Sequence, residues 1–229
     1  MSSDNEEEGA GLDLFQEPEG YFQPEKPPTY ATHKLESGEE LKVRLVGFNP
    51  LWGHHIWNAA RIISNFLVTL PPAHAIRSRT VLELGAGAGL PSLGYLWGAD
   101  PAPLLAHLPD GGEGEKGFDV LILADLLFNH SEHGKLVQSV KRTMKRDKGA
   151  VAYVFFTPYR PWLLEKDLAF FDLAASEGLR VRKLGEDVME KVMFEEDPGD
   201  ELLRRTVFSY ELRWADLVSE EDGLGEQQQ

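Results

Sequence analysis

The stretch "TVLELGAGAGLPSLGYLWGADPAPLLAHLPDGGEGEKGFDVLILAD", residues 80–125, decides the fold. It begins with a short apolar strand, "TVLEL", and ends with a second one, "FDVLILAD", in which polar and apolar residues hardly alternate. A strand buried on both faces has this pattern, which is typical of a parallel sheet covered by helices. The stretch therefore predicts an α/β domain with a glycine-rich loop directly after its first strand.

The flanking sequence extends this prediction in both directions. Residues 31–47 alternate on both sides of Ser37-Gly38 and predict a hairpin, and residues 56–67 place apolar side chains on one helical face. After the stretch, the pattern predicts a helix capped by Ser131, a buried strand, a helix closed by Gly178 and two alternating strands. These later elements span residues 131–144, 149–158, 161–178, 179–185 and 204–214. This order is typical of an α/β fold with an antiparallel finish.

Length and composition limit the function classes. The 229 residues suit one domain at 31–217, between a largely disordered acidic tail at 1–30 and a polar tail at 218–229. The absence of cysteine excludes disulfides and thiolate metal sites. A net charge of −15 disfavours nucleic acid and anionic membranes as partners and favours a basic partner. Without a signal peptide or a membrane-length apolar run, we expect a soluble, cytoplasmic protein.

The glycine-rich loop has two interpretations. Gly85, Gly87 and Gly89 either make a tight turn from strand to helix or let the backbone approach a ligand closely. Glu83 favours the ligand, because a carboxylate at the end of an apolar strand is costly unless something binds it. Phosphate-binding loops use lysine or a bare helix N-terminus instead of an acid. An acid followed by glycines favours a cofactor that is cationic and carries no phosphate, such as S-adenosylmethionine.

Four segments of the chain carry a family resemblance. "LVGFNPLWGHHIWNAARIISNFL", "VLELGAGAGLPSL", "GYLWG" and "ILADLLFNHSEHGKLV" resemble the fungal elongation-factor N-terminal and lysine methyltransferases, over roughly residues 12–215. These belong to the seven-strand, lysine-targeting protein methyltransferases. The resemblance implies a Rossmann-like sheet and S-adenosylmethionine as methyl donor, and we expect a monomer. It also implies translation elongation factor 1-alpha as substrate, methylated on its N-terminal glycine and on the lysine that follows.

The resemblance also implies site residues. Asp125 begins an Asp-x-x-aromatic motif that holds the acceptor amine in lysine-targeting relatives, since a carboxylate can orient an amine and an aromatic face can hold it. The alternative for Asp125 is an N-cap or loop carboxylate. Asn129 either lines the acceptor site or belongs to a hydrogen-bonded loop, and His130 and His133 lack a third ligand for a metal. The expected cofactor-binding residues are Trp52, Trp57, Glu83, Gly85, Ala86, Gly87, Trp97 and Ala124.

The interval between the two strands is too short for this family. Only the 33 residues 85–117 separate them, where the seven-strand fold carries two strands with their helices, and one βαβ unit alone takes about 30 residues. The segment "PAPLLAHL" predicts a two-turn helix. Asp100 precedes a proline and Asp110 precedes two glycines, so neither ends a strand as the ribose-binding acid should.

We therefore predict that two strands are missing after Leu93. This loss would leave "TVLEL" at a new sheet edge and weaken or abolish cofactor binding. Two other functions stay open on the sequence. The chain could be a non-catalytic protein-binding module derived from this fold, which cofactor titration would reveal. It could also methylate a small molecule, which an assay against a basic N-terminal peptide would distinguish.

Overall fold

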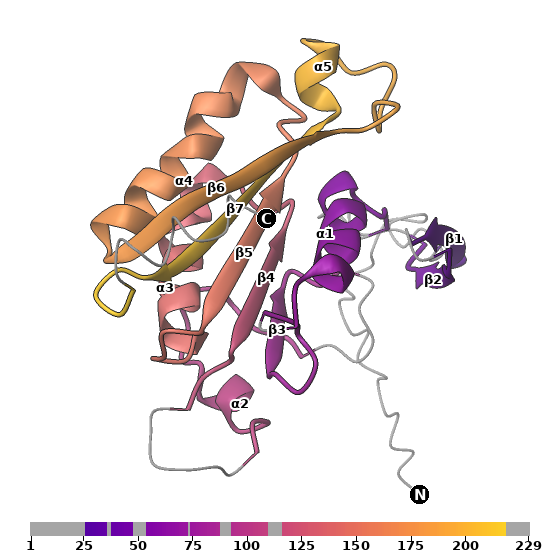
Figure 1. Ribbon diagram of the computed structural model, residues 1–229. Helices are drawn as coiled ribbons and strands as arrows, with labels where there is room; N and C mark the ends of the chain where they lie inside the picture. Colours follow the sequence, from indigo (N-terminus) through magenta and orange to yellow (C-terminus); the bar gives the residue numbers. More distant parts are fainter. Residues whose placement is uncertain are drawn as a thin grey trace, which may run out of the picture.

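The computed structural model describes residues 26–35, 38–47, 54–72, 74–87, 93–109 and 116–218. Within these ranges the chain forms a five-stranded mixed sheet in the order β3-β4-β5-β7-β6 and a separate two-stranded hairpin (Figure 1). The strands of the large sheet are β3 (Val81–Leu84), β4 (Val120–Ala124), β5 (Val151–Phe156), β6 (Leu179–Val188) and β7 (Thr206–Trp214). The predicted tails lie almost wholly outside the described residues.

The sheet confirms the predicted α/β class. In the described residues it has five strands, two fewer than the seven-strand methyltransferase sheet. β3, β4 and β5 run parallel, with Leu84 opposite Leu123 and Ala124 opposite Phe155. β7 pairs antiparallel with β5, and β6 pairs antiparallel with β7, which is the predicted antiparallel finish. β3 is the end strand of the sheet, so the predicted new edge is present.

Helices cover both faces of this sheet. α1 (Asn58–Thr69) lies on one face, while α3 (His133–Thr143) and α4 (Leu164–Ser176) lie on the other (Figure 1). Alternate residues of β5 serve the two cores, with Tyr153 packing among the α1 residues and Val154 among those of α3 and α4. All six residues of β5 are buried, which explains why its sequence does not alternate.

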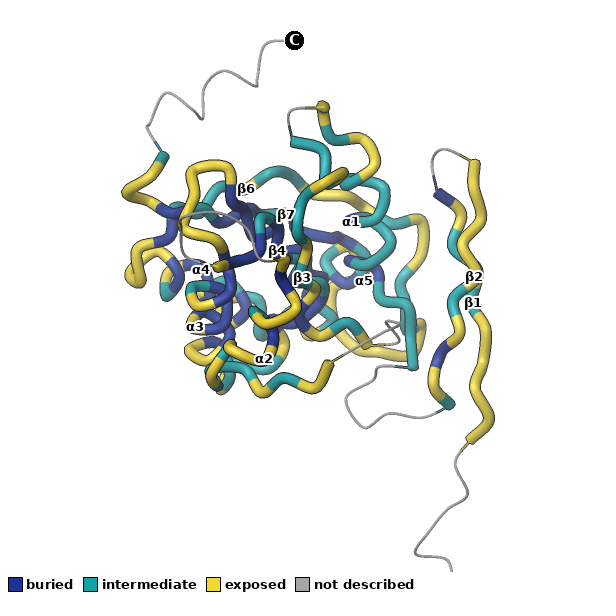
Figure 2. Tube along the Cα trace, turned by 90° about the horizontal axis from the view of Figure 1, so that it is seen from below, coloured by how far each residue is buried: buried dark blue, intermediate teal, exposed yellow. Residues whose placement is uncertain are grey.

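The predicted hairpin is confirmed and stands beside the body of the molecule. β1 (Thr29–Lys34) pairs antiparallel with β2 (Glu40–Leu45), and most of its residues are exposed or half-buried (Figure 2). His33 Nε2 lies 2.9 Å from Ser64 Oγ and links the hairpin to α1. None of the helices in the described ranges is long and apolar enough to cross a membrane.

Several local predictions were wrong. α3 is preceded by a 3-10 turn, η1 (His130–Glu132), and begins after Glu132 instead of Ser131. The Ser131 hydroxyl donates to Asn129 Oδ1 at 3.0 Å, so Ser131 does not cap the helix. α2 (Ala102–Leu105) makes one turn where two were expected. A second 3-10 turn, η2 (Pro161–Leu163), precedes α4, and the sequence did not suggest α5 (Glu201–Arg204).

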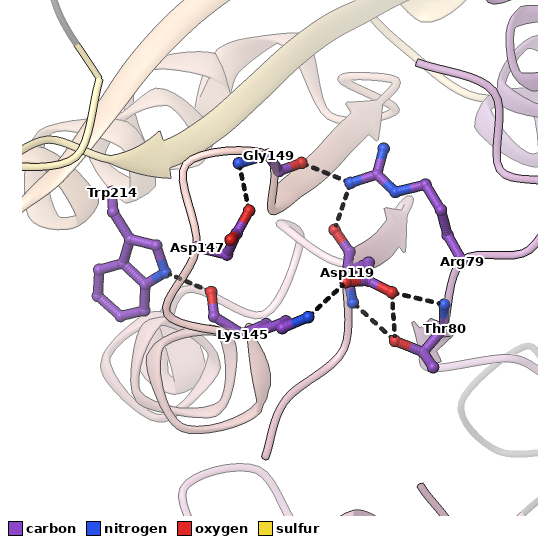
Figure 3. Close-up of polar contacts among 7 residues, drawn as sticks. All are labelled: Arg79, Thr80, Asp119, Lys145, Asp147, Gly149 and Trp214. Carbon is purple, nitrogen blue, oxygen red and sulfur yellow. Dashed lines mark hydrogen bonds and ion pairs between the residues drawn. The ribbon is translucent and has the colours of Figure 1, made fainter. Parts of the chain in front are cut away.

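A polar network fixes the start of β3 to β4 (Figure 3). The Thr80 backbone N–H and hydroxyl both donate to Asp119 Oδ2 at 2.9 Å, and the Asp119 N–H donates to Thr80 Oγ1. Arg79 Nη2 donates to the carbonyl oxygens of Asp119 and Gly149. Burial alone would raise the pKa of Asp119, but the Thr80 hydrogen bonds and the nearby Lys145 and Arg79 charges lower it overall. The edge strand is therefore held firmly at the end where it enters the sheet.

Candidate functional site

The candidate site lies where the three parallel strands end. Gly85 follows β3, Asp125 follows β4 and Thr157 follows β5. The Asp125 N–H donates to the Phe155 carbonyl at 2.8 Å, which continues the pairing of β4 with β5 by one residue. The carboxyl ends of parallel strands are where open α/β sheets bind ligands. Ala124, the last residue of β4, is half-buried at the same edge.

Asp125 is held from three directions. Its side chain is 8% exposed. Oδ1 accepts from the Thr157 N–H at 2.7 Å, and Oδ2 accepts from the Ala59 N–H at 3.0 Å and from the Tyr159 hydroxyl at 3.4 Å. Its φ is 53°, a left-handed value that among the described non-glycine residues only Ser78 shares. Backbone held in this region is common at functional sites.

The ionisation of Asp125 is poised near neutrality. Burial raises the pKa of its carboxyl from the ordinary 3.8 to about 7, although the N–H groups of Thr157 and Ala59 and the Tyr159 hydroxyl oppose the rise. The Thr157 hydroxyl lies close enough to influence this pKa but makes no hydrogen bond of acceptable geometry. A carboxyl with a pKa near the working pH suits the binding and deprotonation of an amine.

Four aromatic rings, His55, Trp57, Tyr159 and Phe194, contact one another and reach this carboxyl through Tyr159, and they are called the aromatic cluster below. Trp57 lies edge-on to Tyr159 with ring centroids 5.0 Å apart, and Phe194 lies 5.9 Å from Trp57 and 6.1 Å from Tyr159. His55 contacts both Trp57 and Phe194, at 6.0 and 5.6 Å. All four side chains are half-buried. Such rings can hold an alkylammonium group by cation–π contact.

Of the members of this cluster, sequence analysis named only Trp57 as a site residue. Tyr159 follows β5 in "TPYRPW", and an aromatic residue just beyond a buried strand could have been recognised as facing the ligand edge. Tyr159 also joins the parts of the site, because its hydroxyl accepts from the Asn58 N–H at 3.2 Å and donates to Asp125. Phe194 lies in the connection between β6 and α5, and no sequence signal identifies it.

The glycine loop and Glu83 lie beside this site on β3. Glu83 pairs with Ile122 of β4, and its carboxyl has no hydrogen bond or ion pair with another described residue. Its side chain is exposed by surface area, yet partial burial raises the pKa of the carboxyl; because water reaches the group, solvent screening limits this effect. Gly85 and Gly87 have φ values of 71° and 56°, which favour glycine. A Cβ on Gly85 would lie 2.5 Å from Leu126 Cδ2.

These residues fit one half of S-adenosylmethionine. A carboxylate without a protein partner suits the cationic methionine end of that molecule, and Gly85, half-buried Ala86 and Gly87 bring bare backbone close to it. The ribose end has no comparable support in the described ranges, where no strand pairs with the outer side of β3 to supply an acid.

Three other predicted residues are not members of the aromatic cluster. Trp97 packs against the core on the α3 face, where Gly98 donates its N–H to Ser139 Oγ at 2.8 Å. Asn129 Oδ1 accepts a hydrogen bond from the Ser131 hydroxyl, and its role at the acceptor site stays a prediction. Trp52 lies outside the described residues, so its prediction stays open.

The loop after Asp125 is fastened by two histidines. His130 Nε2 lies 2.7 Å from Asp167 Oδ1 on α4, and His133 Nε2 lies 2.8 Å from the Leu127 carbonyl. The part of the chain that the structure describes contains no group of three potential metal ligands. Two shallow hollows of about 270 and 320 Å³ lie along α3 and beside Trp214, away from Asp125.

Comparisons with known proteins agree with this arrangement. The sequence model of a family described as Lysine methyltransferase matches residues 36–96. A relative from Emericella nidulans is 44% identical, with 89% of this chain and 96% of the relative covered. Relatives from Neurospora crassa and Schizosaccharomyces pombe are 42% and 37% identical, covering 91% and 92% of this chain and 91% and 97% of the relatives. All three are named protein N-terminal and lysine N-methyltransferase.

The same comparisons support an internal shortening. The alignment with the Emericella nidulans protein spans 250 positions, whereas 89% of this 229-residue chain is about 204 residues. Roughly 46 of the 250 aligned positions therefore have no counterpart in this chain. The family match ends at residue 96, three residues after the predicted break at Leu93. Two strands with their connections fit a block of this size.

Proposed function

This chain belongs to the lysine methyltransferase family, and we propose that its site receives the N-terminal α-amine and the adjacent lysine of a basic protein for methylation. The proposed donor is S-adenosylmethionine, and the proposed substrate is translation elongation factor 1-alpha. The internal shortening weakens donor binding in this chain. The observation that carries the proposal is the buried Asp125 carboxyl, poised near neutral pKa among the aromatic cluster at the ends of β4 and β5.

The residues of the site divide the work on the amine. The Asp125 carboxylate orients the amine and, with a pKa of about 7, can accept a proton as the amine becomes the neutral nucleophile. Trp57, Tyr159 and Phe194 hold the ammonium form by their ring faces and exclude water. When bound, S-adenosylmethionine supplies the methyl group that the amine nitrogen attacks, and its sulfur leaves as a neutral thioether.

The substrate proposal has two supports. The curated relatives are named for N-terminal and lysine methylation. The chain carries a net charge of −15, which favours encounter with a basic protein and disfavours one with an acidic protein. Elongation factor 1-alpha comes from the resemblance of the quoted segments and is the specific substrate to test.

The donor half of the proposal predicts a large defect. Glu83, Gly85, Ala86 and Gly87 would hold the methionine end, while the ribose end lacks the strand that should carry its acid. A charged hydrogen bond contributes roughly 1.5–3 kcal/mol, and loss of the pocket wall adds to this. Donor affinity should therefore be at least about a hundredfold weaker than in a chain with the complete sheet.

The test compares this chain with a restored one. The restored variant carries, between Leu93 and Gly94, the segment of the Emericella nidulans relative that has no counterpart here. S-adenosylmethionine is titrated calorimetrically into both proteins, and methyl transfer is measured on a basic peptide beginning Gly-Lys. We expect micromolar donor binding and methylation only from the restored chain. Micromolar binding of S-adenosylmethionine by the shortened chain would refute the proposed defect in donor binding. A restored chain that binds the donor but leaves the peptide unmodified would refute the proposed acceptor site.

The lost strands favour one second candidate function. The proposed acceptor residues follow β4 and β5, precede α1 or lie between β6 and α5, and the shortening removes none of these segments. The chain could then act as a non-catalytic module that binds the amino terminus of its partner without methylating it. Peptide binding in the absence of donor, with no methyl transfer at saturating donor, would identify this function.

A further inference from the structure

Some of the buried polar atoms without hydrogen-bond partners belong to residues at the candidate site. Among the described residues, four buried side-chain atoms have no hydrogen-bond partner: Asn58 Nδ2, Thr157 Oγ1, Arg204 Nε and Arg205 Nε. A buried polar atom without a partner destabilises the fold, so native proteins retain few of them without a reason. An unmade hydrogen bond at a ligand edge is readily explained by a ligand that completes it.

Two of these residues, Thr157 and Asn58, adjoin Asp125, and Arg204 contacts a member of the aromatic cluster. The Thr157 N–H donates to Asp125 Oδ1, and Ala59, the residue after Asn58, donates to Asp125 Oδ2. Arg204 Nη1 donates to the Phe194 carbonyl at 2.7 Å, which places Arg204 directly behind the cluster. The unmade hydrogen bonds therefore mark the candidate site independently of the carboxyl itself.

Asn58 is the member whose chemistry is most specific. It is the first residue of α1 and only 6% exposed, and its backbone N–H is already used by the Tyr159 hydroxyl. Side chains of a helix tilt toward its N-terminus, which here meets Tyr159 and Asp125. The Asn58 side-chain amide is therefore an unsatisfied hydrogen-bond donor close to Asp125, the carboxyl group that we propose binds the substrate amine.

We propose that Asn58 Nδ2 donates a hydrogen bond to the carbonyl oxygen of the substrate's first residue while Asp125 holds its α-amine. This inference rests on the proposed function and adds a specificity-determining residue to it. In a peptide, only one carbon separates the terminal amine from the first carbonyl. The ε-amine of lysine has no carbonyl at that separation. Asn58 therefore favours an α-amine over a lysine amine at the same carboxylate.

The test measures peptide binding to the full chain without any donor. The probes are a basic octapeptide beginning Gly-Lys and the same peptide with an acetylated N-terminus, which offers only the lysine amine. Replacing the amide by an apolar group, Asn58→Leu, should weaken the free-amine peptide about tenfold and leave the acetylated peptide within about twofold. Asn65→Leu, two turns along α1, is the matched control and should change neither affinity.

Stability measurements separate this role from a structural one. Because the Asn58 amide is unsatisfied in the free protein, Asn58→Leu should keep or raise the melting temperature while it lowers free-amine affinity. Asn58→Ala introduces no larger side chain, so it serves as the second variant if leucine does not fit at this position. If Asn58→Leu changed the affinity for both peptides equally, or for neither, the proposed role of Asn58 would be overturned. The proposed acceptor site would not be affected by that result. A wild-type chain that binds neither peptide would overturn the proposed acceptor site and this inference with it.

Discussion

β5 and β3 end at the same edge of one sheet but are built very differently. All six residues of β5 are buried, and strands flank it on both sides. Of the four residues of β3, only Leu84 is buried; Val81 is 38% exposed, and β4 is the only strand in the described ranges that pairs with β3. Two residues proposed to bind the amine, Asp125 and Tyr159, follow the inner strands β4 and β5, whereas the loop proposed for the donor follows the edge strand. The comparison shows how one shortening can separate the two halves of a two-substrate site.

The largest effect should come from removing the carboxyl on the inner side. Asp125→Ala should lower the affinity for the free-amine peptide more than a hundredfold and should also destabilise the fold, because the N–H groups of Ala59 and Thr157 lose their buried acceptor. Glu83→Ala, at the exposed edge, should change the free energy of unfolding by less than about 0.5 kcal/mol. Peptide titration and chemical denaturation of both variants measure these effects. Equal destabilisation by Asp125→Ala and Glu83→Ala would contradict the expected difference between the inner strands and the edge strand.

A smaller effect should appear in the pH dependence of stability. The folded pKa of Asp125 is raised from 3.8 to about 7, so the folded state binds this proton more tightly than the unfolded state does. The contribution of Asp125 to the free energy of unfolding is fully present below about pH 4 and is lost as the pH rises through about 7. Over this range the free energy of unfolding falls by up to roughly 1.4 kcal/mol per pH unit.

Denaturation between pH 4 and 8 measures this slope. Asp125→Asn cannot titrate, so the difference between it and the wild type isolates the group. Glu83→Gln serves as the comparison from the exposed edge and should leave the slope nearly unchanged. A wild-type curve parallel to that of Asp125→Asn across the whole range would contradict a raised pKa.

The smallest effect on stability is expected at the outer side of β3. Val81→Lys places a charge on an exposed edge strand, where it should shift the free energy of unfolding by less than about 0.5 kcal/mol and reduce self-association. Light scattering during slow heating measures the second effect. Val151→Lys, in the wholly buried β5, is the contrasting change and should prevent folding. If Val81→Lys aggregated as readily as the wild type, the edge would not be the source of association.

The sequence predicted the strands well because their apolar runs reflect burial on both faces. "FDVLILAD" and "GAVAYVFFTP" indicated β4 and β5, and the short interval before "FDVLILAD" indicated the missing strands. Asp125 could be singled out because it directly follows a buried strand. Its partners could not, since Tyr159 and Phe194 come from distant segments and meet Trp57 only through tertiary packing.

Local rules failed where side chains found other partners. Ser131 had the character of an N-cap, but its hydroxyl is used by Asn129, and a 3-10 turn separates it from α3. Gly185 was expected to end the strand that begins at Leu179. Instead, β6 shifts register at this glycine and continues its pairing with β7 to Val188. Cross-strand pairing outweighed the local preference of glycine for a turn.

The order of strands in the sheet has a consequence for what a shortened chain can retain. Among the described residues the ladder between β3 and β4 is continuous, and the sheet runs from β3 to β6 without interruption. A shortening after Leu93 therefore leaves the middle of the sheet intact. On the proposed function, it would keep the residues assigned to the acceptor while it removes support for the donor.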